Sequence, residues 1–298
     1  MGDPALSVVI PTRDRCSILL STLKALDSQR GLNWWFEVIV VDDGSTDDTS
    51  AVLSEASFSG FRLIPLALDA GGPARARNRG VSQARADRIL LLGDDTIPNA
   101  GSLAHHVKAD PENRSAIQGR IDWDGSWTTV TPVMEFLAPE GPQFYFKGLS
   151  EGLPVPFWAT VSSNLSAPKQ WFLDDPFDER FTAACMEDTE LAYRWNKRNL
   201  PVIFSDRASC RHRHRYDSIE PFLARQHEAG RWARLAASLH PGMIPVLIFK
   251  PLLFGAAVAL RHAARWPRGS EMQRDSWDLM CKWAYLRGFL GFTHAIGS

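Results

Sequence analysis

Short apolar runs alternate with amphipathic segments along the first hundred residues of the chain. The runs have the length and residue types of buried strands, whereas the segments between them carry apolar residues at helical spacing. The predicted strands are residues 6–10, 36–41, 61–66 and 89–92, and the predicted helices between them are residues 18–26, 47–56 and 74–84. This alternation predicts an α/β domain whose central sheet is mainly parallel and covered on both faces.

The pattern changes in the second half of the chain. Residues 122–152 are rich in Trp, Pro and Gly, which is typical of loops over a pocket or of a small antiparallel section. Strand character returns at residues 158–166, a helix is predicted at 188–198, and amphipathic helices are predicted at 221–239 and 277–289. We therefore predict a first domain over residues 1–216 and a helical C-terminal extension over residues 217–298.

An apolar run, residues 243–260, separates the last two predicted helices. It is a poor membrane span, because it contains two prolines and Lys250, and a Lys at the bilayer centre costs about 2.5–3.5 kcal/mol. Arginines and tryptophans on both sides suit a helix that lies on an anionic membrane surface. The sequence leaves two alternatives open: a peripheral membrane contact through residues 243–268, or a buried helix in the core or in a homodimer interface.

Charge and cysteine content exclude several protein classes. With 33 basic and 34 acidic residues the chain has no overall field that would attract nucleic acid, so any anionic ligand must be recognised locally. Its four cysteines are widely separated and form no C-x-x-C pair, which argues against a disulfide framework and a structural zinc site. No secretion signal is visible at the N-terminus. We expect a cytoplasmic protein, with attachment to the cytoplasmic membrane face as an option.

Polar clusters follow the predicted strands at their carboxyl ends. The run 89–92 stops at Gly93-Asp94-Asp95, residues 11–15 (PTRDR) follow the first strand, and residues 42–47 (DDGSTD) follow the second. Ligands of open α/β sheets bind at this edge, where adjacent carboxylates can hold a divalent cation and the cation can hold phosphate. An Asp pair before a turn is also ordinary turn chemistry, so no single cluster is decisive.

Two further clusters complete an ordered series: residues 71–80 (GGPARARNRG), which open a helix, and residues 186–191 (MEDTEL). Over about residues 6–216 this series resembles family 2 glycosyltransferases of the GT-A fold. The resemblance implies an inverting, hexosyltransferase-like enzyme with Mg²⁺ or Mn²⁺ on the donor diphosphate. The implied partners are a UDP- or GDP-linked sugar donor and a saccharide or lipid-linked acceptor, as in the assembly of surface polysaccharides or glycolipids.

The resemblance also implies a role for individual residues. The implied catalytic residues are the acidic pair Glu187 and Asp188. Inverting transfer needs a carboxylate that takes the proton of the acceptor hydroxyl, and Asp188 matches that base. The implied nucleotide-binding residues are Pro11, Thr12, Arg13, Asp42, Arg77 and Asp94, and the implied metal ligands are Asp95, His212 and His214. Simpler roles compete with these: a turn at Asp42, a solvated helix face for Arg77, and a helix N-terminus for Asp188.

The sequence departs from the family pattern at one position. The family usually has Asp-x-Asp where this chain has Gly93-Asp94-Asp95, so the first carboxylate is lost and Asp95 matches the last, which bears on metal affinity and donor choice. Residues 211–215 (RHRHR) would, if extended, place the two histidines on one face and the arginines on the other. Alternative functions are a nucleotidyltransferase, which also uses carboxylate-held metal, and a non-catalytic nucleotide-sugar-binding protein.

Overall fold

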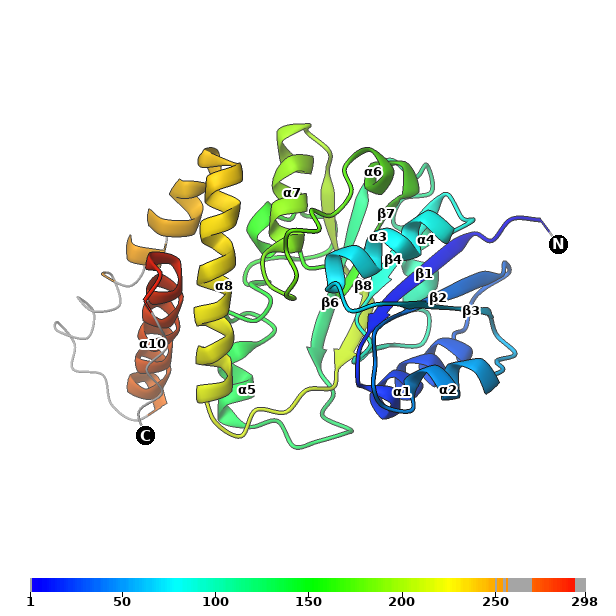
Figure 1. The fold of residues 1–298 in the computed structure, drawn as a ribbon, viewed down its shortest axis with the longest axis horizontal. Helices are drawn as coiled ribbons and strands as arrows, with labels where there is room; N and C mark the ends of the chain where they lie inside the picture. The colour runs from blue at the N-terminus through cyan, green and yellow to red at the C-terminus, as the bar shows by residue number, and fades with distance from the viewer. Residues whose placement is uncertain (1, 250, 254–255, 257–269, 293–298) are drawn as a thin grey trace. The chain divides into compact units, whose positions relative to one another are not determined.

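The computed structural model describes residues 2–249, 251–253, 256 and 270–292 of the chain. Its central element is an eight-stranded sheet in the order β3-β2-β1-β4-β7-β6-β8-β5 (Figure 1). The strands are β1 (Leu6–Thr12), β2 (Phe36–Asp43), β3 (Arg62–Leu68), β4 (Arg88–Leu92), β5 (Thr96–Pro98), β6 (Ala116–Trp123), β7 (Asn164–Pro168) and β8 (Val202–His212). The first four strands are parallel, as predicted, and β6 pairs with β8 in parallel.

The second half of the sheet is mixed. Strand β7 runs antiparallel to both β4 and β6, and the short strand β5 runs antiparallel to β8. The strand predicted at residues 158–166 begins later, because residues 157–159 form a 3₁₀ turn before β7. Strands β5 and β6 are not predicted from the sequence, since β5 has only three residues and β6 mixes polar and apolar residues without strict alternation. The α/β prediction is confirmed.

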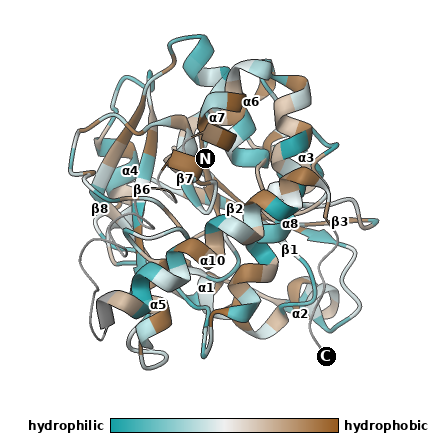
Figure 2. Cartoon of the chain, turned by 90° about the vertical axis from the view of Figure 1, so that its left-hand side faces the viewer, coloured by the Kyte–Doolittle hydropathy of each residue, from teal (hydrophilic) through white to brown (hydrophobic). Residues whose placement is uncertain are grey.

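Helices cover both faces of the sheet. They are α1 (Cys16–Asp27), α2 (Thr49–Glu55), α3 (Pro73–Gln83), α4 (Ser102–Lys108), α6 (Lys169–Asp174) and α7 (Glu187–Lys197), whereas the short helix α5 (Pro132–Leu137) groups almost entirely with the C-terminal helices. Apolar residues of α1, α2 and α4 share a core with Val8, Ile10 and neighbouring positions of β2 and β4. Helix α3 packs on the opposite face, where a Cβ at Gly80 would lie 2.4 Å from Val9 Cγ1. The helices carry both hydrophobic and hydrophilic segments, as amphipathic cover helices should (Figure 2).

A buried histidine joins α4 to the sheet. His106 is fully buried, with Nε2 2.9 Å from Asn164 Oδ1 and Nδ1 3.0 Å from Ser166 Oγ. Asn164 Nδ2 donates to two backbone carbonyls, which leaves its Oδ1 as the acceptor for His106 Nε2–H. The ring is therefore neutral, and burial lowers the pKa of His106 to about 3.

We expect His106 to make the protein sensitive to acid. Below pH ~6.5 the unfolded chain binds a proton at this ring that the folded chain does not, so the free energy of unfolding falls by up to ~1.4 kcal/mol per pH unit towards pH 3. Glu187, whose pKa is raised to about 7, acts in the opposite direction between pH 4.5 and 7. Urea unfolding of wild type and His106→Gln from pH 7.5 to 5 isolates the histidine. The stability advantage of the wild type should shrink on acidification, and a constant difference would contradict the assignment.

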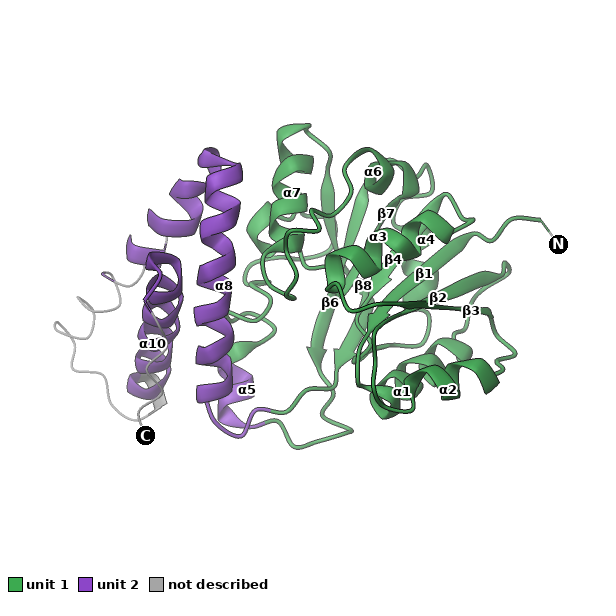
Figure 3. Cartoon of the chain, in the orientation of Figure 1, with its two compact units in different colours: residues 1–130, 137–215 green, residues 131–136, 216–298 purple. Residues whose placement is uncertain are grey.

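The chain divides into two compact units (Figure 3). Unit 1 consists of residues 1–130 and 137–215 and contains the sheet, and unit 2 consists of residues 131–136 and 216–298. The short stretch 131–136, which falls inside the first predicted domain, thus groups with the C-terminal helices. Within unit 2, α8 (Glu220–Leu239) and α10 (Ser270–Leu290) pack closely, because a Cβ at Gly230 would lie 1.9 Å from Tyr285 O and one at Gly288 would lie 1.9 Å from His227 O.

Between these helices, residues 241–243 form a 3₁₀ turn and residues 245–249 a π-helical turn. Most of the segment 243–268, for which the sequence leaves a membrane contact and a buried helix as alternatives, lies outside the described residues. Among the residues that the structure describes, no helix has the length and apolar content needed to cross a bilayer.

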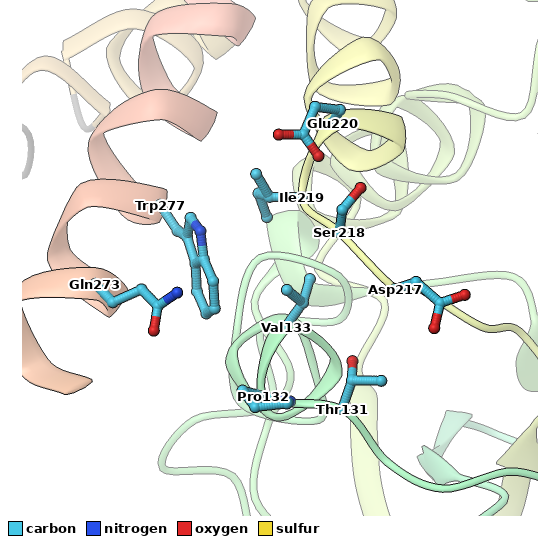
Figure 4. Close-up of a pocket in the computed structure, with 9 residues that line it drawn as sticks. All are labelled: Thr131, Pro132, Val133, Asp217, Ser218, Ile219, Glu220, Gln273 and Trp277. Carbon is cyan, nitrogen blue, oxygen red and sulfur yellow. The ribbon is translucent and has the colours of Figure 1, made fainter.

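Unit 2 also contains a pocket of about 340 Å³ (Figure 4). The residues around it come from α5, from the start of α8 and from α10: Thr131, Pro132, Val133, Asp217, Ser218, Ile219, Glu220, Gln273 and Trp277. Trp277 also packs against Phe136, with ring centroids 5.6 Å apart. None of the residues predicted to bind nucleotide, metal or acceptor lines this pocket.

Candidate active site

The predicted polar clusters meet at one edge of the unit 1 sheet. In the parallel register Thr12 lies opposite Asp42, and Val9 lies opposite Leu91 of the strand that leads into Asp94 and Asp95. The carboxyl ends of β1, β2 and β4 are therefore neighbours. Apolar strand interiors fix this register, because a slip by one residue would turn every buried side chain to the other face.

The carboxylates of Asp94 and Asp95 lie in a tight turn after β4. Thr96 N donates to Gly93 O at 3.1 Å, which closes the turn, and both carboxylates are buried. Thr12 Oγ1 donates to Asp94 Oδ2 at 2.9 Å. Arg15 contacts both acids, with Nη1 3.0 Å from Asp94 Oδ1 and Nη2 2.7 Å from Asp95 Oδ2. A single guanidinium thus bridges the pair.

His212 completes this cluster from the end of β8. Its Nε2 lies 3.2 Å from Asp95 Oδ2, and its backbone pairs with Thr96 of β5, so the short strand brings the histidine to the carboxylates. His214 stacks on His212 with ring centroids 5.8 Å apart. Of the three predicted metal ligands, the structure therefore brings Asp95 and His212 into direct contact and stacks the His214 ring on that of His212.

Two of the predicted nucleotide residues differ in setting. Pro11 is part of β1 opposite Val41, whereas the Arg13 side chain is 53% exposed and lies 3.7 Å from Asp14. Arg15, which the sequence analysis did not select, is the arginine of this loop that reaches the carboxylates. Nothing in the local pattern distinguishes the two arginines, because the choice depends on how the loop enters α1.

The local charges shift the carboxyl groups in opposite directions. Burial, together with the charge of Asp95, raises the pKa of Asp94 to about 6. Burial also opposes the charge of Asp95, but His212 and Arg15 outweigh it and hold the pKa of Asp95 below its usual value. The pKa of Arg15 is raised, since its attraction to the two acids exceeds the effect of its partial burial. Asp95 thus stays ionised at lower pH than Asp94 does.

Gly93, where the family usually has Asp, has a packing reason in this chain. A Cβ at this position would lie 2.7 Å from Thr96 Oγ1 and 3.1 Å from Asp95 Oδ1. Thr96 is fully buried, so its β-branched side chain has little room to turn away. A larger residue at position 93 would push against the very carboxylate that is predicted to bind metal.

Adjacent carboxylates at the end of β2 have different partners. Asp42 Oδ1 accepts a hydrogen bond from Ser45 N at 2.8 Å, within its own turn. Asp43 instead accepts hydrogen bonds from Gly71 N and Gly72 N, both at 2.8 Å, and so holds the glycine loop that opens α3. Gly72 has a φ of +94° and lies against Thr182, which explains the glycine. The role of Asp42 in nucleotide binding stays a prediction.

Arg77 does not lie on a solvated helix face. It is 7% exposed, and its Nη1 donates to Glu187 Oε1 at 2.8 Å, joining α3 to α7. Burial and the neighbouring Asp188 charge raise the pKa of Glu187 to about 7, although Arg77 opposes this rise. Arg77 Nε and Glu187 Oε2 are buried without a hydrogen-bond partner among the described residues. Such atoms are rare in folded proteins and mark a place where a ligand or water fits.

Asp188 is half-buried at the start of α7. Its Oδ2 accepts a hydrogen bond from Ser162 N at 3.2 Å, and its Oδ1 one from Thr189 N at 2.8 Å. The next residue of that loop, Ser163, accepts a hydrogen bond from Gly93 N through its carbonyl oxygen at 3.1 Å. Two consecutive loop residues therefore connect the predicted base with the turn that carries Asp94 and Asp95.

A buried carboxylate beside the site was not predicted. Asp124 accepts hydrogen bonds from Arg211 Nη1 at 3.2 Å and Arg213 Nε at 2.7 Å, while Arg213 N donates to Asp95 O at 2.8 Å. The two arginines thus turn away from the histidines, in agreement with the predicted alternation along residues 211–215. Asp124 and these arginines are more than 85 positions apart, so no local sequence pattern predicts their pairing.

The side chains at this site suit a metal ion that is held partly by the protein and partly by a bound ligand. Within the described part of the chain no group of three Asp, Glu, His or Cys side chains is arranged as a complete metal site. Asp95 and His212, however, converge with one carboxylate oxygen and one imidazole nitrogen. An ion that bridges a nucleotide diphosphate needs only one or two protein carboxylates, because phosphate and water supply the other ligands. The residues fit such an ion and not a protein-only cage.

Comparison with known proteins agrees with this architecture. The family model described as glycosyl transferase family 2 matches residues 7–164, more than half of the chain. The amylovoran biosynthesis glycosyltransferase AmsB of Erwinia amylovora is 28% identical over 68% of this chain and 67% of its own length. Validoxylamine A glucosyltransferase of Streptomyces hygroscopicus subsp. jinggangensis is 31% identical over 83% of this chain, which spans only 63% of that relative.

Solved structures show the same fold at low sequence identity. The mannosyltransferase PcManGT from Pyrobaculum calidifontis, solved with GDP-Man and Mn²⁺, has a TM-score of 0.61 at 16% identity and covers 97% of this chain and 87% of its own. The S. aureus TarS fragment 1–349, solved with UDP, has a TM-score of 0.53 at 17% identity, covering 95% of this chain and 88% of its own. The chain has the GT-A-like fold and belongs to glycosyl transferase family 2.

Proposed function

We propose that the chain transfers a sugar from a nucleotide-diphosphate donor to a glycan or lipid-linked acceptor, with inversion and with a divalent metal. The observation that carries the proposal is the connection between Asp188 and the Asp94–Asp95 turn through Ser162 and Ser163. It gives the site an acceptor-side carboxylate next to a donor-side acidic turn. A nucleotidyltransferase would need the second feature only.

The donor half of the site consists of the ends of β1, β2 and β4. Asp42 would accept hydrogen bonds from the base or ribose, and the loop held by Asp43 would border the nucleotide. Asp95 and His212 would hold Mg²⁺ or Mn²⁺. When bound, such an ion neutralises the charge that develops on the departing diphosphate. Asp94, held by Thr12, would contact the ribose or the donor sugar.

The acceptor half is the start of α7. In a single displacement the acceptor hydroxyl attacks the anomeric carbon as Asp188 takes its proton, and the nucleoside diphosphate leaves from the opposite face. Hydrogen bonds from Ser162 N and Thr189 N hold the carboxylate in a fixed orientation. Glu187, buried against Arg77, fixes the helix terminus on which the base sits.

The compared proteins support a donor class. PcManGT was solved with GDP-Man and Mn²⁺, and TarS with UDP, which supports a UDP- or GDP-linked sugar for this chain. AmsB is named for the biosynthesis of a polysaccharide, which supports a surface-glycan acceptor. Because the chain spans less than two thirds of the validoxylamine A glucosyltransferase, the acceptor of that relative is not transferred to it.

A screen that needs no acceptor tests the proposal. The protein is heated with each of a panel of UDP- and GDP-sugars, with Mn²⁺ or with EDTA, and slow hydrolysis of the donor is measured in parallel. At least one donor should raise the melting temperature and be hydrolysed only with Mn²⁺, since a ligand that binds the folded state stabilises it by mass action. Equal stabilisation by every nucleotide with EDTA present would contradict a metal-dependent transferase.

A further inference from the structure

Arg15 lies where a cation is expected at the proposed metal site. Its two terminal nitrogens each face a different carboxylate, at 3.0 Å from Asp94 and 2.7 Å from Asp95. This fork matches the way guanidinium groups bind carboxylates. The positive charge on Arg15 compensates part of the repulsion between two buried neighbouring acids.

The atoms of Asp95 and His212 that would bind the metal already contact other groups while Arg15 is in place. Asp95 Oδ2 is the oxygen contacted by Arg15 Nη2, and the same oxygen lies 3.2 Å from His212 Nε2. An ionised carboxylate only accepts hydrogen bonds, so His212 must direct a hydrogen, not a lone pair, at Asp95. A divalent ion therefore needs both contacts to break before it can use the oxygen and the imidazole.

The Arg15 side chain has a route away from the acids. It is 38% exposed, whereas the Asp94 and Asp95 side chains are 8% and 12% exposed. Arg15 is the residue that precedes α1, three positions after Thr12 at the end of β1. A guanidinium released from two carboxylates is well suited to bind phosphate oxygens in the same bidentate manner.

We propose that Arg15 is an internal counter-ion that blocks the metal site in the donor-free protein and moves to the donor phosphates when metal and nucleotide bind together. The identity of the metal and the donor rests on the proposed function. Metal alone then binds weakly, because it must displace a guanidinium. Metal with a nucleoside diphosphate binds tightly, because the displaced guanidinium gains phosphate partners.

Manganese binding without nucleotide tests this directly. Free Mn²⁺ is measured by electron paramagnetic resonance during titration of wild type, Arg15→Gln and Arg15→Lys. Arg15→Gln should bind Mn²⁺ about tenfold more tightly than wild type, within the 5- to 150-fold range usual for coupled sites, and Arg15→Lys should lie between them. The control is Arg114→Gln, whose side chain is 80% exposed and pairs with Glu112, and it should match wild type.

The second arm adds UDP or GDP. Each nucleotide should tighten Mn²⁺ binding strongly in wild type and much less in Arg15→Gln, since the variant lacks the group that couples the two. Unchanged Mn²⁺ affinity in both Arg15 variants, or equal tightening by nucleotide in all proteins, overturns the counter-ion role. Should Arg15→Gln fail to fold, Arg15→Lys retains the charge and still has to bind Mn²⁺ more tightly than wild type.

These outcomes are separate from those of the proposed function. A wild type that binds nucleotide and Mn²⁺ together but hydrolyses and transfers no sugar would overturn the transferase and leave the Arg15 result intact. If the wild type hydrolyses donor but the Arg15 variants bind Mn²⁺ like wild type, the counter-ion role of Arg15 is overturned and the transferase assignment stands.

Discussion

Replacement of Asp188 by Asn should lower the rate of sugar transfer by about a hundred- to ten-thousandfold and leave donor binding close to normal, as expected for loss of a general base. The Asn side chain keeps an oxygen that can accept a hydrogen bond from Ser162 N or Thr189 N, so the start of α7 should retain its structure. The measurement is turnover under donor saturation, with nucleotide affinity determined by calorimetry on the same preparations.

A matched carboxylate serves as the control. Asp174 at the end of α6 is 40% exposed and pairs with Arg198, so Asp174→Asn removes one negative charge from unit 1 without touching the predicted site. It should behave like wild type in both measurements. Near-normal turnover in Asp188→Asn would remove Asp188 from the role of base, and loss of nucleotide binding in the same variant would point to a role in the donor half instead.

Replacement of Arg77 by Met should destabilise the protein by about 3–5 kcal/mol, the usual cost of leaving one member of a buried ion pair without its partner. The loss should depend on pH. Without Arg77 the pKa of Glu187, already about 7, rises further, so the folded state must hold a proton that the unfolded state releases above pH ~4.5. The deficit therefore grows from pH 6 to pH 8, which urea unfolding at both values would measure.

The double variant Arg77→Met/Glu187→Leu separates two roles of Arg77. Because the unpaired carboxylate is gone, the double variant should regain much of the lost stability. If Arg77 also contacts the nucleotide, as the sequence predicts, UDP or GDP affinity stays low in the double variant although the fold has recovered. Recovery of both would restrict Arg77 to joining α3 and α7. A double variant as unstable as Arg77→Met would contradict the ion-pair explanation altogether.

The sequence predicts best where strands are apolar and local signals are strong. Strands β1, β2 and β4 are mainly apolar, and acids stand at or just after the ends of β2 and β4, so both the fold class and the common edge of the site follow from the pattern. The start of α7 is also predicted within one residue, because acidic residues mark a helix N-terminus.

Long-range pairing limits the prediction elsewhere. Strand β5 exists only because its three residues pair with β8, more than a hundred positions later, and that pairing is what brings His212 to Asp95. The Arg77–Glu187 pair likewise joins residues 110 positions apart. Arg13 and Arg15 are both arginines in the same short segment, so the sequence does not distinguish them. Only the path of the loop into α1 decides which one contacts the acids.

The hydrogen bonds of Asp43 have a practical consequence for the design of chimeric proteins. This carboxylate accepts hydrogen bonds from both Gly71 N and Gly72 N, so the end of β2 and the loop before α3 form one structural unit that should be exchanged together. A graft that replaced residues 42–45 without residues 69–73 would leave a carboxylate or two amide groups without hydrogen-bond partners. Each unpaired buried group would destabilise the fold by about 1–3 kcal/mol. Chimeras between relatives should therefore take both segments from the same parent.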